Sequence, residues 1–217
     1  VVKADENSHW NYQFTQLPKY DERGGRYQYF VTEDNVPGYM TNIDSKSGVI
    51  TNTLDTTQVI VTKAWSDFDN KFSLRPESIK VNLLQNGEII EVVPTATVKA
   101  DESGEWSYTF TDLPKYDATG KAYLYTVEEE KVPGYATSIA SPLNEEEGET
   151  RFAIVNTLET TEVTITKAWS DFDNKFGLRP ESIKINLLQN TKIIEEVPTA
   201  TVKADESGEW SYTFTDL

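Results

Sequence analysis

An internal repeat constrains the fold of this chain more than any other sequence feature. The segment TKAWSDFDNKFSLRPESIKVNLLQN at residues 62–86 returns at residues 166–190 with only two changes. A second landmark, VPGY, occurs at residues 36–39 and again at residues 132–135. A chain built from near-identical copies is expected to fold as a row of similar units.

Aligning the copies divides the chain into three parts. We expect residues 57–159 to form one complete repeat with an incomplete repeat on each side. Residues 1–56 are predicted to be the C-terminal part of a repeat, because VKADENSHW corresponds to a motif inside the complete copy. Residues 160–217 are predicted to be an N-terminal part, because they stop at TDL, where the complete copy continues. The complete copy also carries extra acidic residues at 141–149, which we expect to form a surface loop.

Short apolar segments separated by turn residues indicate an all-β fold. Aromatic and β-branched residues are frequent, and no segment has a convincing helical period. Seven strands are predicted in the complete repeat, at residues 58–65, 78–85, 88–93, 95–100, 105–113, 122–129 and 151–158. Such strands favour a β-sandwich, in which the RPE tripeptide at 75–77 would form a loop or at most one helical turn.

Charge and missing residue types argue against several functions. The formal net charge of −16 disfavours nucleic acid and anionic lipid as partners. The chain has no cysteine and a single histidine, His9, so we expect no metal site, no cofactor and no catalytic triad. No apolar run approaches the ~18 residues needed to span a bilayer, and the amino terminus does not look like a signal peptide. We therefore expect a soluble chain that does not contact a membrane.

Strand alternation places polar side chains on faces that are otherwise apolar. A lysine follows two valines in the first strand, a glutamate ends an aromatic series in the penultimate strand, and an asparagine interrupts the last strand. All of them are predicted to point into the core of their repeat. They are Lys63, Glu129 and Asn156 in the complete repeat, Glu33 and Asn52 in the first part, and Lys167 in the third.

A buried lysine, glutamate and asparagine that meet can form a covalent bond. Burial lowers the pKa of an amine and raises that of a carboxylic acid, which gives a neutral amine beside a protonated acid. The amine can attack the carboxamide, while the acid hydrogen bonds the carboxamide oxygen and shuttles a proton to the departing ammonia. Taken singly, each residue type is more often a solvated, snorkelling or turn-forming group. Their shared order and facing in every copy favour an amide cross-link.

The motifs also resemble a known family. In order, VTKAW, LRPESIKVNLLQNGE, WSYTFTDLPKYD, YTVEEEKVPGY and IVNTL resemble the B-type repeat of Gram-positive collagen adhesins, the Cna B-type domain. The resemblance covers the complete copy and both flanking parts. It implies tandem immunoglobulin-like β-sandwiches that act as stalk modules of cell-wall-anchored, extracellular adhesins and pilins.

Many members of that family form an autocatalytic lysine–asparagine isopeptide bond assisted by an acid. The resemblance therefore implies a bond between Lys63 and Asn156 with Glu129 as the catalytic acid, and the same roles for Lys167, Asn52 and Glu33. Glu128 is a neighbouring candidate for the acid, but strand alternation favours Glu129. Such a reaction occurs once per molecule, so the chain is not expected to be an enzyme.

The expected partners are adjacent repeats of the same protein. The two incomplete repeats could also pair between molecules, giving head-to-tail self-association. The alternative function is a ligand-binding adhesin region that recognises a host matrix protein. Other regions of the same protein could also bind such a partner.

Two other sites are weaker alternatives. A calcium site at Asp67, Asp69 and Asn70 lacks the glycine and the final glutamate of an EF-hand, so a solvated loop is favoured. An aromatic binding surface could use Trp65, Trp106 and Tyr108, but sandwich aromatics more often pack in the core. Dispersed acids without an indicated cleft disfavour a glycosidase.

Overall fold

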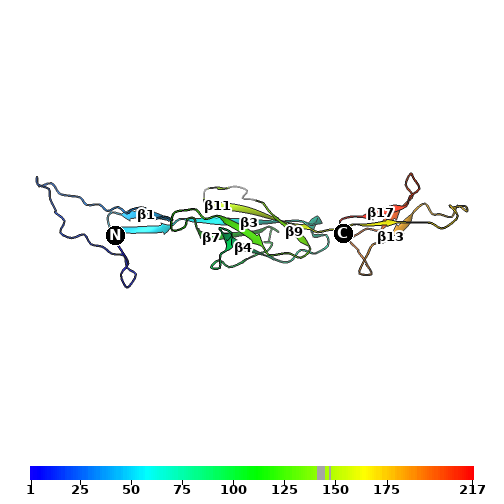
Figure 1. Ribbon diagram of the computed structural model, residues 1–217, viewed down its shortest axis with the longest axis horizontal. Helices are drawn as coiled ribbons and strands as arrows, with labels where there is room; N and C mark the ends of the chain where they lie inside the picture. Colours follow the sequence, from blue (N-terminus) through cyan, green and yellow to red (C-terminus); the bar gives the residue numbers. More distant parts are fainter. Residues whose placement is uncertain (141–144, 147) are drawn as a thin grey trace.

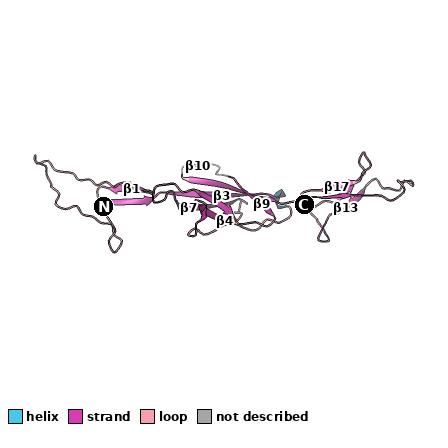
Figure 2. Ribbon diagram, viewed as in Figure 1, coloured by secondary structure: helices cyan, strands magenta, loops and turns pink. Residues whose placement is uncertain are grey.

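The protein is an elongated chain of β-structure. The computed structural model describes residues 1–140, 145–146 and 148–217. Three parts follow one another along the longest axis, with the central part between the other two (Figure 1). Most of the strand structure lies in the central part, whereas the flanking parts consist largely of loops and short strands (Figure 2). Across the described residues, no helix has the length and apolar character needed to cross a membrane.

The first sheet of the central part brings the two ends of this part together. Its order is β10–β11–β3–β7, and β9 also pairs with β11. Strands β3 and β11 run parallel over nine register pairs, from Gln58↔Glu149 to Ser66↔Thr157. The first and last strands of the central part are therefore direct neighbours. The five strands are β3 (Thr56–Ser66), β7 (Trp106–Pro114), β9 (Tyr135–Ile139), β10 (Glu145–Glu146) and β11 (Glu149–Leu158).

The second sheet is built around β4. Strands β5 and β6 pair with β4 at different points along it, and β8 also pairs with it. All three pairings are antiparallel. The four strands are β4 (Ile79–Gln85), β5 (Glu88–Ile89), β6 (Ala96–Val98) and β8 (Tyr125–Glu129).

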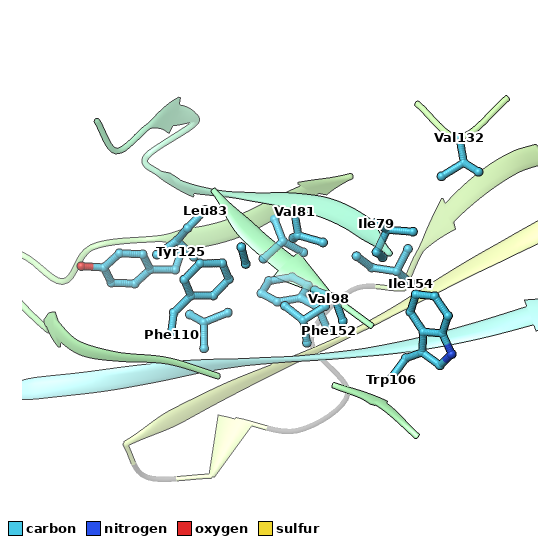
Figure 3. Close-up of a cluster of buried hydrophobic side chains, with 14 of the residues drawn as sticks. Ile79, Val81, Leu83, Val98, Trp106, Phe110, Tyr125, Val132, Phe152 and Ile154 are labelled. Carbon is cyan, nitrogen blue, oxygen red and sulfur yellow. The ribbon is translucent and has the colours of Figure 1, made fainter. Parts of the chain in front are cut away.

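A hydrophobic core fills the space between the two sheets (Figure 3). Val59 and Val61 from β3 and Ile154 from β11 have no exposed surface, and they pack with Val81 of the opposite sheet. Along β3 the buried positions alternate with more exposed ones, as the sequence pattern predicts. The predicted all-β sandwich is confirmed.

The structure differs from the predicted elements in several places. The predicted strand at 88–93 shortens to β5, because the chain turns where the backbone N–H of Val93 donates to the Ile90 carbonyl. The RPE tripeptide forms a loop, as favoured from the sequence, and a short 3-10 helix that was not predicted occurs at Phe68–Asn70. Strands β9 and β10 were not among the predicted strands. Within the expected loop at 141–149, β10 pairs with the start of β11, and residues 141–144 and 147 lie outside the described residues.

The flanking parts contain the same kinds of element in smaller sheets. In the first part, β1 (Tyr39–Asp44) and β2 (Val49–Leu54) form a two-stranded antiparallel sheet. In the third part, Ala200, Val202, Trp210 and Phe214 form a small buried cluster. The strands of this part are β12 (Val163–Thr166), β13 (Ile183–Ile185), β14 (Leu188–Gln189), β15 (Lys192–Ile193), β16 (Ala200–Val202) and β17 (Ser211–Phe214).

Short connections join consecutive parts. Asp55 is the only residue between β2 and β3. Its N–H donates to the Gly38 carbonyl at 2.9 Å, and its carbonyl accepts the N–H of Lys115 at 2.9 Å. The next junction repeats the first contact, because the N–H of Glu159 donates to the Gly134 carbonyl at 2.9 Å. Each junction thus has little free chain that could absorb an applied load.

Candidate functional site

Four strands bring polar side chains together at one end of the core. Lys63 lies on β3, Asn156 on the neighbouring β11 and Thr137 on β9, which pairs with β11 on its other side. Thr137 is the direct register partner of Asn156. Glu129 comes from β8 in the opposite sheet. Alternation within their own strands directs Lys63, Glu129 and Asn156 toward the space between the sheets. Thr137 is exposed, and the pairing of β9 with β11 places it beside them.

The side chains of Lys63 and Asn156 are buried, and each contacts the buried carboxylate of Glu129. The Lys63 and Glu129 side chains have 0% exposed surface, and Lys63 Nζ lies 3.8 Å from Glu129 Oε1. Asn156 has 0% exposure, and its Nδ2 donates a hydrogen bond to the same Oε1 at 3.1 Å. A single carboxylate oxygen therefore contacts both the amine and the carboxamide nitrogen. Glu128, the neighbouring candidate, is exposed.

The environment of Lys63 favours an uncharged amine. Burial lowers the pKa of Lys63 to about 8, although the negative charges of Glu129 and Asp67 oppose the shift. Roughly a tenth of such an amine is uncharged at pH 7, compared with less than a thousandth at an ordinary lysine pKa. The ammonium form is held by the Ala64 carbonyl at 2.9 Å and by the ring of Trp65, whose centroid lies 4.1 Å from Nζ.

The carboxamide of Asn156 is oriented with its nitrogen toward the glutamate. The mechanism inferred from the sequence predicts a hydrogen bond from the acid to the carboxamide oxygen. In the structure Glu129 instead accepts a hydrogen bond from Nδ2. Within the described part of the chain, Asn156 Oδ1 is buried without a hydrogen-bond partner. A buried, unpaired carbonyl oxygen is costly, and it leaves the carboxamide less stabilised than it would be in water.

The first part of the chain repeats half of this cluster. Asn52 Nδ2 donates to Glu33 Oε1 at 3.2 Å, which matches the contact between Asn156 and Glu129. Glu33 and Asn52 were predicted to be buried, but both are exposed, because β1 and β2 form only a two-stranded sheet. The acid–amide contact therefore forms in the first part without burial.

The third part repeats the other half. Lys167 Nζ donates to the Ala168 carbonyl at 2.5 Å and lies 4.2 Å from the centroid of the Trp169 ring. Lys63 makes the same two kinds of contact in the central part. Lys167 is half-buried. The lysine of the third part thus makes its contacts with the two residues that follow it, Ala168 and Trp169.

A second buried polar network lies beside the site and was not found from the sequence. Asp67 is 3% exposed and accepts two hydrogen bonds from the Arg75 guanidinium, at 2.6 Å and 2.5 Å. The hydroxyl of Tyr135 donates to Asp67 at 3.2 Å. The hydrogen bonds from Arg75 hold the pKa of Asp67 below its usual value, and burial raises the pKa of Tyr135 to about 12. Asp171 and Arg179 form the same bidentate pair in the third part.

This network argues against the calcium site considered at Asp67, Asp69 and Asn70. Both oxygens of Asp67 are engaged by Arg75, and Asn70 Oδ1 accepts the backbone N–H of Arg75 at 3.0 Å. Asp69 is exposed. Among the described residues, no group of three or more histidine, cysteine, aspartate or glutamate side chains could hold a metal ion.

We predict that Asp67→Asn destabilises the central part by about 3 kcal/mol at pH 7, because it leaves the guanidinium without its buried partner. The pKa of Asp67 is lowered on folding, so its contribution is fully present above an ordinary aspartate pKa and is lost as the pH falls through the lower folded value. Urea unfolding at pH 7 and near pH 2 measures both effects. The matched control is Asp69→Asn in the same loop. Equal midpoints for the two variants at pH 7 would contradict a stabilising role for the pair.

The aromatic side chains near the site act mainly in packing. Trp106 is 9% exposed, and Trp65 packs edge-to-face against both Trp106 and Tyr135 at centroid distances of 5.3 Å and 5.0 Å. Of the three aromatics considered as a binding surface, only Tyr108 is exposed, at 37%. The tryptophans thus form one wall of the site around Lys63.

The fold and this buried cluster define the protein class as a tandem immunoglobulin-like β-sandwich protein. The family model of the Cna protein B-type domain matches residues 1–53, 59–157 and 163–217. The chain therefore belongs to this family, and the resemblance identified from its motifs is confirmed.

Proteins similar to this chain include a collagen adhesin and B repeat structures of Staphylococcus aureus. A collagen adhesin of Staphylococcus aureus is 39% identical over 218 residues, a match that covers all of this chain and 17% of the adhesin. The solved structure of two B repeat units of the S. aureus collagen binding protein has 39% identity and a TM-score of 0.44, and the match covers 99% of this chain and 54% of that one. A single B repeat unit has 40% identity and a TM-score of 0.37, covering 75% of this chain and 78% of the other.

Proposed function

We propose that this chain is part of the stalk of a Gram-positive cell-surface adhesin or pilin, and that an isopeptide bond between Lys63 and Asn156 reinforces its central repeat. The observation that carries the proposal is the buried contact of Lys63 and Asn156 with one oxygen of Glu129. The adhesin relative supports a surface location and a spacer role. The chain spans 17% of the length of that relative.

The bond forms by transfer of an acyl group between two nitrogens. A proton passes from Lys63 Nζ to Glu129 Oε1, and the neutral amine then attacks Cγ of Asn156. The proton on Oε1 moves to Nδ2, which leaves as ammonia when the Cγ–Nδ2 bond breaks. The new amide nitrogen returns a proton to the carboxylate. The reaction occurs once per molecule and needs no cofactor, so the chain is not a turnover enzyme.

The domain boundaries form part of this proposal. Residues 57–159 are one complete repeat, residues 1–56 the C-terminal part of the preceding repeat and residues 160–217 the N-terminal part of the following one. The repeated contacts of Glu33 with Asn52, and of Lys167 with the Trp169 ring, support equivalent roles for these residues in the neighbouring repeats.

Intact-mass measurement tests the chemistry. The unsubstituted chain is expected to be lighter than its calculated mass by about 17 Da, the mass of one ammonia. Glu129→Gln is expected to abolish this loss, because a carboxamide cannot relay the proton. Glu128→Gln, the same change at the exposed neighbour, is expected to keep the loss. A full calculated mass for the unsubstituted chain would refute the proposal.

The same samples test self-association. The central part separates the two flanking parts in space (Figure 1), which favours pairing between molecules over pairing within one. A third part that supplies Lys167 to the Glu33–Asn52 pair of another molecule would give covalent multimers. A ladder on a denaturing gel that Lys167→Ala removes is the expected result, and monomers alone would reject this mode of assembly.

The alternative function is recognition of a host matrix protein, by this region or by others of the same protein. It is supported by the name of the collagen adhesin relative. Direct binding of the chain to immobilised collagen would favour it, and the absence of binding would leave the stalk role.

A further inference from the structure

Thr137 contacts the site but takes no part in the proposed proton transfers. Its hydroxyl donates to Glu129 Oε2 at 2.6 Å, while Oε1 faces Lys63 and Asn156. The two carboxylate oxygens are therefore in different surroundings. One contacts both reacting nitrogens, and the other is held by a hydroxyl.

The same contact occurs in the first part of the chain. Thr41 occupies the corresponding place, as the register partner of Asn52 on the neighbouring strand. Its hydroxyl lies 3.0 Å from Glu33 Oε2 and 2.8 Å from Asn52 Oδ1. Both copies thus place a threonine hydroxyl on the second oxygen of the acid, and in the first copy the hydroxyl also contacts the amide oxygen. Because the first copy is exposed and the central copy is buried, burial alone does not account for the contact.

We propose that Thr137 is a positioning residue for formation of the isopeptide bond, an inference that rests on the function proposed above. By fixing Oε2, the hydroxyl sets the rotation of the carboxylate so that Oε1 both receives the proton of Lys63 and delivers it to Asn156 Nδ2. Without the hydroxyl the carboxylate can rotate. A surface hollow of about 480 Å³ borders both Glu129 and Thr137, so water can then compete for the carboxylate.

Thr137 can be substituted so that only its hydroxyl group is removed. Thr137 is exposed at the edge of the sheet, so Thr137→Val keeps the shape and β-branching of the side chain while removing only the hydroxyl. Thr137→Ser restores the hydroxyl without the methyl group. Thr157→Val makes the same chemical change at an exposed residue next to Asn156, and it serves as the matched control.

The test follows the reaction in the full chain after cell-free synthesis is stopped. Samples are quenched in acid at intervals, and mass spectrometry gives the fraction that has lost about 17 Da. Resistance to trypsin at the same times gives the folded fraction, so rates are expressed per folded chain. Thr137→Val is expected to react about tenfold more slowly, whereas Thr137→Ser and Thr157→Val stay within about twofold of the unsubstituted chain.

The outcomes separate this inference from the proposed function. Equal rates for Thr137→Val and Thr157→Val would overturn the role of Thr137 and leave the isopeptide bond intact. A slow Thr137→Ser variant would also overturn it, because the hydroxyl would not then be the important group. No mass loss in the unsubstituted chain would overturn both the function and this inference.

Discussion

Lys63→Ala is expected to release about 300 Å of hidden chain when the protein is stretched between its ends, whereas the unsubstituted central repeat releases none. Load enters this repeat at the start of β3 and leaves it at the end of β11. With the bond in place, force passes along β3 to Lys63, crosses to Asn156 and continues into the junction at Glu159. The roughly 90 residues between the bonded side chains are then shielded from the load.

Without the bond, the resistance comes from hydrogen bonds alone. Strands β3 and β11 are parallel neighbours, so pulling on their opposite ends shears the register that runs from Gln58↔Glu149 to Ser66↔Thr157. These hydrogen bonds break together at a force far below that of a covalent bond. The junctions add little compliance, because a single residue separates β2 from β3.

Single-molecule force spectroscopy on the whole chain measures the released length. Lys80→Ala is the matched control, because Lys80 is an exposed lysine of β4 whose Nζ donates a hydrogen bond to the exposed Thr97. Like the unsubstituted chain, Lys80→Ala is expected to release no hidden length from the central repeat. If the unsubstituted chain also shows the long extension, no covalent bond carries the load.

Much of the fold could be predicted because the predicted strands have a simple two-residue period. Val59, Val61 and Lys63 share a buried face in the structure, as alternation indicates. Strand β9 escaped prediction because YATSI is mostly exposed and follows a turn, so it has no alternating apolar face. Its importance comes from pairing with β11, and pairing is a long-range property that a single segment does not reveal.

The candidate site shows the same division between local and long-range information. The facing of Lys63, Glu129 and Asn156 follows from their own strands, which is why it could be inferred residue by residue. The pairing of Asp67 with Arg75 could not, because it depends on a tight turn in which Phe68, Asp69 and Asn70 all have positive φ angles. Thr137 had a signal in the sequence, since a threonine follows VPGY by two residues in both copies. Its role became visible only once the strands were paired.

The second large effect is on the stability of the central repeat. Glu129→Gln, which prevents bond formation, is expected to lower the free energy of unfolding by about 4 kcal/mol, by analogy with a disulfide that closes a loop of similar length. For a domain of this size the midpoint of thermal unfolding should fall by about 20 °C. The loss arises mainly in the unfolded state, because an unbonded chain gains conformational freedom that a closed loop denies it. Differential scanning calorimetry measures the midpoint.

Two further measurements separate this effect from the loss of a buried ion pair. Glu128→Gln is the matched control and should leave the midpoint unchanged, because that side chain is exposed on the opposite face of β8. Small-angle X-ray scattering in concentrated urea should show a larger radius of gyration for Glu129→Gln than for the control, because only a covalent loop restricts an unfolded chain. Equal dimensions in urea, together with a lowered midpoint, would assign the stability to folded-state contacts of Glu129 and would argue against the bond.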